Sequence, residues 1–138
     1  MRRVVPDASV LLKWVLHEGE SHLDQALALQ ADIIAGRVQA LLPPLWYFEV
    51  GNTLGRRFPE QAPRALAGLR AFAIEERMLG VEAEVTALRL MRECGVTFYD
   101  AAYHALAIES GATFVTADAR YLEAARAWRH ASHLMDWA

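Results

Sequence analysis

Short apolar runs alternate with longer stretches of helical periodicity along the 138 residues of the chain. The runs favour strands and are bounded by Pro, Gly or Asp, whereas apolar residues three and four positions apart predict amphipathic helices. We predict strands at residues 3–6, 39–42, 79–81, 112–116 and 132–135. We predict helices at residues 8–16, 21–35, 45–57, 63–77, 84–94, 100–110 and 119–128. This alternation is typical of an α/β protein with a parallel sheet.

The composition fits one globular domain that spans residues 1–138. Hydrophobic residues make up 54% of the chain and charged residues 22%, and no repeat or linker divides it. Asp7 interrupts the N-terminal apolar run, so we expect no signal peptide. Residues 38–55 carry few charges but contain two prolines and Asn52, so we expect no membrane span. The single cysteine, Cys94, excludes an intramolecular disulfide and a Cys-based zinc site, and we expect a cytoplasmic protein.

The net charge of −3 does not by itself indicate a nucleic-acid-binding protein, which usually presents a basic face. Of the 14 basic residues, only Lys13 is a lysine. Arginine is the better bidentate ligand for phosphate, but the base composition of the gene is the simpler explanation for such a bias. Net charge is also a poor guide if several acids share a metal site, because bound cations reverse the local sign.

Four acidic residues occupy unusual positions. Asp7 and Asp118 each follow a predicted strand directly and precede a helix. Asp100 opens a predicted helix, and Glu49 is the only charged residue between Arg37 and Arg56. In an open parallel sheet, ligands bind beyond the carboxyl ends of the strands, where the strand order reverses. Asp7 and Asp118 could therefore face each other across such a crevice.

Each acid also has a simpler interpretation. Asp7, Asp100 and Asp118 are all good N-caps, and taken singly capping is the better explanation. Glu49 could point outward from an amphipathic helix, but apolar neighbours on nearly every side argue against that, since a buried carboxylate is costly without a partner. Two hydroxyls accompany the acids: Ser9 either caps or orients a carboxylate, and Thr116, on the same side of its strand as Asp118, is expected to orient one.

Convergence of these acids would indicate a metal site. Carboxylates gathered at one place repel each other, and some would be protonated unless a cation lay between them. Oxygen ligands of this kind suit Mg²⁺ or Mn²⁺ better than zinc. A metal held in this way can activate water and stabilise charge on a phosphodiester. Because no Ser–His or Cys–His pair is evident, the acids favour metal-assisted phosphoryl hydrolysis.

The sequence resembles PIN-domain ribonucleases, and in particular VapC toxins of toxin–antitoxin pairs. The resemblance rests on three blocks in order, VVPDASVLLKWVL, LLPPLWYFEVGNTL and VTFYDAAYHALAIESGATFVTADARYL. It implies an α/β/α sandwich with a mostly parallel sheet of four or five strands and helices on both faces. It also implies that four acids hold Mg²⁺ or Mn²⁺ and catalyse hydrolysis, with Ser9 and Thr116 as polar neighbours. Those acids are Asp7, Glu49, Asp100 and Asp118, the last being the one at which family members vary.

The resemblance further implies partners. These are structured RNA such as tRNA or rRNA as substrate, a small VapB-like antitoxin that lays a C-terminal segment into the active-site groove, and a second copy in a homodimer.

Other polar and aromatic residues leave alternatives open. His104 lies four residues after Asp100 on the same helical face and could approach the site, but a packed histidine is the more common outcome. Arg56 and Arg57 could hold RNA phosphates, or could simply suit the negative end of a helix dipole. The aromatic run at residues 46–48 could stack bases, although core or dimer interface is the better explanation.

Two other functions compete with this interpretation. A phosphoaspartate enzyme needs a second acid beside the first and a lysine late in the chain, but Asp7 has no acid within two positions and the only lysine is Lys13. A degenerate or housekeeping PIN domain that only binds RNA or dimerises is the more serious alternative. Such a module would be expected to lose an acid, whereas all four are present.

Overall fold

A computed structural model describes residues 1–138 and contains one five-stranded sheet. All its strand pairs are parallel, and the order is β3-β2-β1-β4-β5. The strands are β1 (Arg2–Pro6), β2 (Val38–Leu42), β3 (Glu75–Glu76), β4 (Thr113–Thr116) and β5 (Ala131–His133). The α-helices are α1 (Ala8–Val15), α2 (Leu23–Ile34), α3 (Leu45–Arg57), α4 (Ala62–Ala71), α5 (Val81–Cys94), α6 (Phe98–Ser110) and α7 (Ala119–Ala124).

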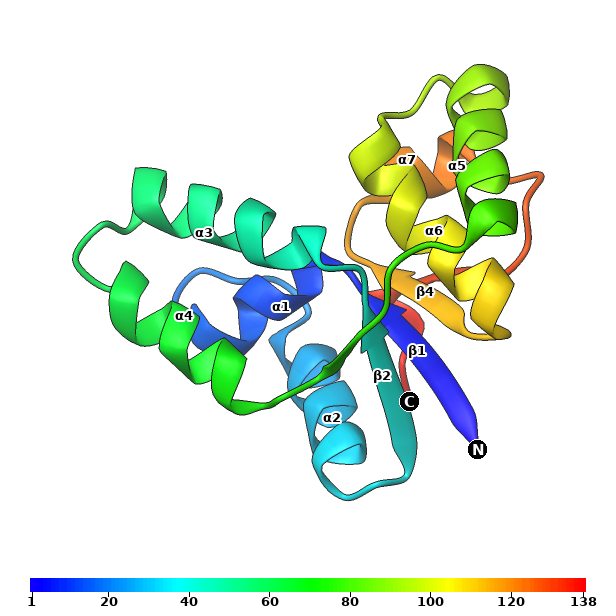
Figure 1. The fold of residues 1–138 in the computed structure, drawn as a ribbon. Coiled ribbons are helices and arrows are strands. Elements are labelled where there is room, and N and C mark those ends of the chain that lie inside the picture. Colours follow the sequence, from blue (N-terminus) through cyan, green and yellow to red (C-terminus); the bar gives the residue numbers. More distant parts are fainter.

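Helices cover both faces of the sheet, as predicted for an α/β/α sandwich. Figure 1 shows α5, α6 and α7 gathered on one side, with α1 and α2 on the other and α3 and α4 extending outward from it. α6 packs on β1 and β4, whereas α1 and α2 contact the opposite side and α4 packs on α3 and α1. No helix has both the length and the apolarity that a membrane span requires.

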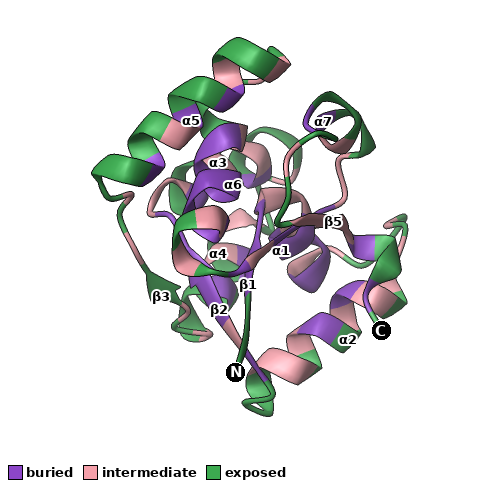
Figure 2. Cartoon of the chain, turned by 90° about the vertical axis from the view of Figure 1, so that its right-hand side faces the viewer, coloured by how far each residue is buried: buried purple, intermediate pink, exposed green.

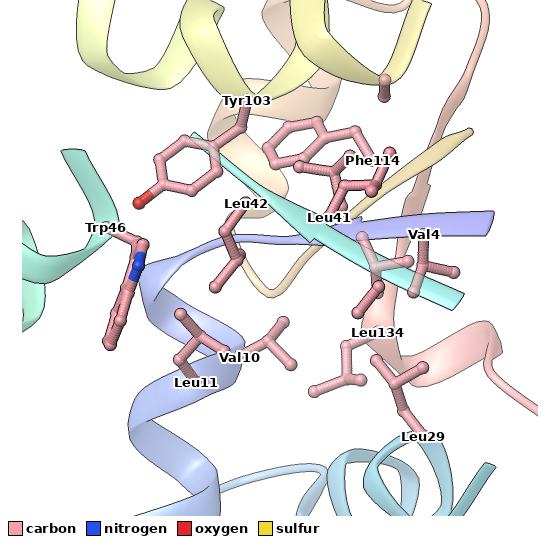
Figure 3. Packing of buried hydrophobic residues seen from close by; sticks show 14 of the residues in the cluster. Val4, Val10, Leu11, Leu29, Leu41, Leu42, Trp46, Tyr103, Phe114 and Leu134 are labelled. Carbon is pink, nitrogen blue, oxygen red and sulfur yellow. The ribbon is translucent and has the colours of Figure 1, made fainter. Parts of the chain in front are cut away.

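The core explains why these apolar runs form strands. A cluster of 26 buried residues surrounds the sheet, and a smaller one of five lies between α5 and α6. Figure 3 shows Val4, Leu41 and Phe114 packed at the sheet with Leu11 below and Tyr103 above. Figure 2 shows that buried residues concentrate at this centre. The strands have few polar positions because both sheet faces are covered, as is usual for parallel sheets.

The strand order reverses between β1 and β4, and this position creates the functional edge. β1 pairs with β2 on one side and with β4 on the other, so the chain leaves the sheet in opposite directions from its centre. Pro6 at the end of β1 is in register with Val115 near the end of β4. The residues that follow both strands therefore emerge side by side at one edge of the sheet.

The region between α4 and α5 differs from the prediction. The predicted helix at 63–77 ends at Ala71 because Ala73 adopts a positive φ of 51°, which stops the helix. The third strand is Glu75–Glu76, paired with Leu41 and Leu42, so the predicted strand at 79–81 is wrong. Partly buried Ile74 and Leu79 pack against the core, which explains why apolar residues continue in the sequence beyond the end of α4.

Smaller differences affect the C-terminal half. α6 begins at Phe98, and its N-cap is Thr97, whose hydroxyl accepts from the Asp100 backbone N–H at 3.2 Å. Asp100 therefore lies in the first turn of the helix and does not cap it. α7 ends at Ala124 and not near residue 128, and a 3₁₀ turn (Leu134–Asp136) replaces the end of the last predicted strand.

Candidate active site

The side chain of Asp7 accepts more hydrogen bonds than that of any other acid in the molecule. It caps α1 directly after β1, and its Oδ1 accepts from the Ser9 and Val10 backbone N–H groups at 3.0 and 3.3 Å. The Ser9 hydroxyl also donates to Oδ1, and the Thr116 hydroxyl donates to Oδ2 at 2.6 Å. Asp7 is only 8% exposed. The capping interpretation is therefore correct, but it leaves unexplained why two further hydroxyls are directed at the same buried carboxylate.

Ser9 and Thr116 also tie the two strand ends together. Ser9 Oγ accepts from the Ala117 backbone N–H at 3.0 Å, which links α1 to the segment after β4. Thr116 Oγ1 accepts from the Asp118 backbone N–H at 3.0 Å while donating to Asp7. Both hydroxyls thus donate to Asp7. Each also accepts from a backbone N–H group of the segment that follows β4. The pair fixes the position of Asp7 relative to the Asp118 loop.

Burial makes the charged form of Asp7 costly. The pKa of this carboxyl is raised to about 6, mainly by burial and to a smaller extent by the charge of Asp100, against the lowering effect of the Ser9, Thr116 and Val10 donors. Burial favours the neutral form of this carboxyl group, whereas its four hydrogen-bond donors stabilise the charged form. Such a combination is typical of functional sites.

Glu49 reaches the same region from α3. It is half-buried, and its Oε1 accepts a 2.6 Å hydrogen bond from the Tyr103 hydroxyl of α6. Burial raises the pKa of Glu49, the Tyr103 donor lowers it, and the charge of Asp100 raises it. Glu49 therefore does not point outward from an amphipathic helix into bulk solvent.

Asp100 and Asp118 complete the set. Asp118 caps α7, and its Oδ1 accepts from the Arg120 and Tyr121 backbone N–H groups at 3.0 and 3.1 Å. Burial raises the pKa of Asp100, and the charge of Asp118 adds to this effect. Asp100 in turn raises the pKa of both Asp7 and Glu49, so its charge acts on acids from two other elements. Asp100 is thus the electrostatic centre of the group.

The donor set fits a hard divalent cation. All four acids offer only carboxylate oxygens, which are the ligands that Mg²⁺ and Mn²⁺ prefer. Besides burial, mutual repulsion raises the pKa of Asp7, Glu49 and Asp100, and a bound cation would relieve it. No three His, Cys, Asp or Glu side chains are arranged so that they could hold a metal ion directly. The assignment of the four acids as ligands stays a prediction.

The other candidates lie elsewhere. His104 is fully buried, with Nδ1 2.8 Å from the Tyr121 hydroxyl and Nε2 2.7 Å from the Arg129 carbonyl, so it is a packed histidine. Arg56 and Arg57 are exposed in the last turn of α3. In the aromatic run at residues 46–48, the first ring is in the core and the other two are exposed.

Tyr103 is the residue that sequence reasoning missed. It lies three residues after Asp100 on α6, so both side chains project from the same helical face. This three-residue spacing from Asp100 could have indicated Tyr103 from the sequence. However, its partner Glu49 is 54 residues away, and no local pattern predicts such a contact.

The comparisons with known proteins agree with this architecture. The PIN-domain family model matches residues 4–127. The structure of PAE2754 from Pyrobaculum aerophilum is similar with a TM-score of 0.66 and 24% identity, covering 96% of this chain and 91% of the other.

A second similar structure is VapC20 of Mycobacterium tuberculosis, described as a toxin that cleaves the sarcin–ricin loop. Its TM-score is 0.66 and its identity 20%, covering 88% of this chain and 94% of the other. No curated protein matches the sequence. The family match extends from β1 through all four candidate acids, and the chain belongs to the PIN-domain family.

Proposed function

We propose that this protein is a metal-dependent endoribonuclease and the toxin of a type II toxin–antitoxin pair. Membership of the PIN family supports a nuclease. The observation that carries the proposal is Asp7, a buried carboxylate that receives two backbone and two hydroxyl donors beside the charge of Asp100. A purely structural cap needs only the backbone donors.

The site residues have two proposed roles: the acids bind the cation, and the hydroxyl residues orient Asp7. Asp7, Glu49, Asp100 and Asp118 would hold Mg²⁺ or Mn²⁺, which supplies an activated water and charge stabilisation for phosphodiester hydrolysis. Ser9 and Thr116 fix both oxygens of Asp7 and so limit its rotation. The buried surroundings of Asp7 lower the local dielectric constant, which strengthens its interaction with a cation.

Structured RNA is the proposed substrate. VapC20 is described as acting on the sarcin–ricin loop, and a similar substrate class, rRNA or tRNA, is proposed here. The exposed Arg56, Arg57 and Tyr47 of α3 are available for RNA contacts. A VapB-like antitoxin is the proposed protein partner.

We also propose that the protein is a homodimer. Large apolar side chains of α3, α5, α6 and the segment before α5 are exposed at one surface, around a groove of about 530 Å³. The exposed side chains that line the groove are Phe48, Met78, Leu88 and Phe98, and α5 also exposes Val81 and Val85. On α5 they repeat every three or four residues, opposite the face that packs on α6 (Figure 2). Monomeric proteins rarely expose patches of this kind.

Light scattering tests the dimer. Leu88→Glu should convert the protein to monomers, because it places a charge in the apolar surface. Ile34→Glu changes a similarly exposed side chain on α2, 67% against 56% exposed, and should leave the dimer intact. Equal masses for the wild type and Leu88→Glu would contradict this interface.

Expression in a bacterial host tests the toxin function. The wild type should arrest growth and leave cut rRNA or tRNA, and Asp7→Asn should abolish both effects while keeping much of the capping geometry. The matched control is Asp24→Asn, at an exposed position in the first turn of α2. A folded Asp7→Asn protein that stays equally toxic would contradict the proposal, and a harmless wild type that binds RNA uncut would favour the degenerate module.

A further inference from the structure

We propose that Tyr103 is a positioning residue: its hydroxyl holds Glu49 at the acidic site and thereby sets the affinity for the divalent cation. The inference rests on the proposed function, because it assigns Glu49 to that site. It adds a residue that is neither acidic nor at a strand end.

The geometry of the contact carries the proposal. The Tyr103 hydroxyl donates to Glu49 Oε1 at 2.6 Å, and the side chain is only 1% exposed. Figure 3 shows the Tyr103 ring above the sheet, with its hydroxyl directed away from Phe114 and toward the side where Trp46 and α3 lie. Burial, together with the hydrogen bond and charge of Glu49, keeps the pKa of the phenol well above its usual range, so it remains a donor.

The ring has little freedom to move elsewhere. It stacks on Phe114 of β4 with centroids 6.2 Å apart and an interplanar angle of 18°. Phe114 lies on the strand that leads to Thr116 and Asp118. The hydroxyl is thus placed relative to the strand end that carries two other site residues.

Glu49 depends more than the other acids on a side-chain hydrogen bond for its position. Asp7 and Asp118 belong to strand ends, and Asp100 belongs to α6, which packs on β1 and β4. Glu49 alone comes from α3, which packs mainly on α1 and α4. The bond from Tyr103 is the one side-chain hydrogen bond between α3 and α6. Without it, the Glu49 carboxylate would have no hydrogen-bond donor.

Tyr121 provides a matched control within the same core. It is also buried, at 3% exposed, and also packs against Phe114, with centroids 5.3 Å apart. Its hydroxyl lies 2.8 Å from His104 Nδ1, and no site carboxylate receives it. Tyr103→Phe and Tyr121→Phe each remove one buried hydroxyl and leave the ring in place. The backbone N–H of Tyr121, which donates to Asp118 Oδ1, is unchanged by the substitution, so only the first variant removes a donor to a site acid.

The experiment measures Mn²⁺ affinity by calorimetry, with RNA cleavage as a second readout. Tyr103→Phe should weaken Mn²⁺ binding about 10–100-fold, the usual effect of removing a hydrogen-bond partner of a metal ligand. It should lower kcat with little change in KM for RNA. Tyr121→Phe should keep the affinity within about two-fold, because its hydroxyl contacts no ligand. Unchanged affinity in Tyr103→Phe, or equal losses in both variants, would overturn the proposal.

A double-mutant cycle with Glu49→Gln separates positioning from a general structural effect. If Tyr103 acts through Glu49, Tyr103→Phe should cause no further loss of Mn²⁺ affinity in the Glu49→Gln protein. A full additional loss there would contradict the proposal. A wild type that binds Mn²⁺ but cuts no RNA contradicts the proposed function alone, since the affinity comparison needs no substrate. A wild type that binds no Mn²⁺ overturns both.

Discussion

Asp7 and Glu49 are expected to bind the same cation, yet the fold holds them in different ways. Asp7 follows the central strand β1 and receives four hydrogen-bond donors, three from the first turn of α1 and one from Thr116 at the end of β4. Glu49 lies on a helix outside the sheet and receives one donor, from Tyr103. The strand-end region is therefore built before a cation arrives, whereas the α3 region depends on a single long-range contact. In the strand-end region, the three donors to Asp7 Oδ1 are predicted to be redundant, whereas Asp7 Oδ2 and Glu49 Oε1 each depend on a single donor and are predicted to be sensitive.

The largest expected change in stability comes from Asp7→Asn in EDTA at pH 8. Burial raises the pKa of the Asp7 carboxyl to about 6, so its charged form costs free energy in the metal-free protein. Neutral Asn should raise the free energy of unfolding by about 1–3 kcal/mol, since one pKa unit corresponds to about 1.4 kcal/mol. Denaturant unfolding measures it. A destabilised Asp7→Asn protein would contradict the expectation that the buried charge costs more than the hydrogen bond lost to the amide.

Thr116→Val should have the next largest effect. Its hydroxyl is the only donor to Asp7 Oδ2 and also accepts from the Asp118 backbone N–H. We expect Mn²⁺ affinity to fall about 10–100-fold, as for other partners of metal ligands. Calorimetry measures this, and Thr113→Val, at the other end of β4, is the control. Unchanged Mn²⁺ affinity in Thr116→Val would contradict a role for this hydroxyl in positioning Asp7.

Ser9→Ala should have a smaller effect than Thr116→Val. Asp7 Oδ1 keeps the Ser9 and Val10 backbone donors when the Ser9 hydroxyl is removed. We therefore expect Mn²⁺ affinity to fall less than about 10-fold, the lower end for such partners. If Ser9→Ala costs more than Tyr103→Phe, the strand-end region is not redundant and the contrast with α3 is wrong.

The smallest expected effect concerns pH and the core beside the site. Burial lowers the pKa of His104, while the Arg129 carbonyl raises it and His130 lowers it. Because the unfolded state takes up the proton first, His104 stabilises the fold above its unfolded pKa, about 6.5, and that contribution is lost as pH falls below it. The melting temperature of the wild type should fall more between pH 7 and 5 than that of His104→Gln. Parallel pH profiles would contradict this assignment.

The sequence predicted best what depends on local pattern. The β1, β2 and β4 runs are short, apolar and bounded by Pro or Asp, so the strands and the acids that follow two of them could be located. α3 was predicted with its observed bounds, because a proline pair precedes it and Phe58-Pro59 follows it. The parallel sheet with helices on both faces followed from the alternation of elements and from the family resemblance, whereas the order β3-β2-β1-β4-β5 came only from the structure.

What the sequence missed depends on tertiary contacts. The strand at Glu75–Glu76 is exposed and charged, and only pairing with β2 makes it a strand. The positive φ of Ala73 has no signal in a residue that otherwise favours helices. The Tyr103–Glu49 bond joins two helices that are distant along the chain. Local periodicity contains no information on such pairs.

Cleavage of purified rRNA and tRNA tests the central claim most directly. The wild type with Mg²⁺ or Mn²⁺ should cut at discrete positions, and EDTA should abolish cleavage. Folded Asp7→Asn should lose about 10³-fold in rate, since a metal contributes several kcal/mol to such reactions, whereas Asp24→Asn should cut at the wild-type rate. Cleavage that persists in EDTA, or in the folded Asp7→Asn protein, would contradict a metal-dependent site at the ends of β1 and β4.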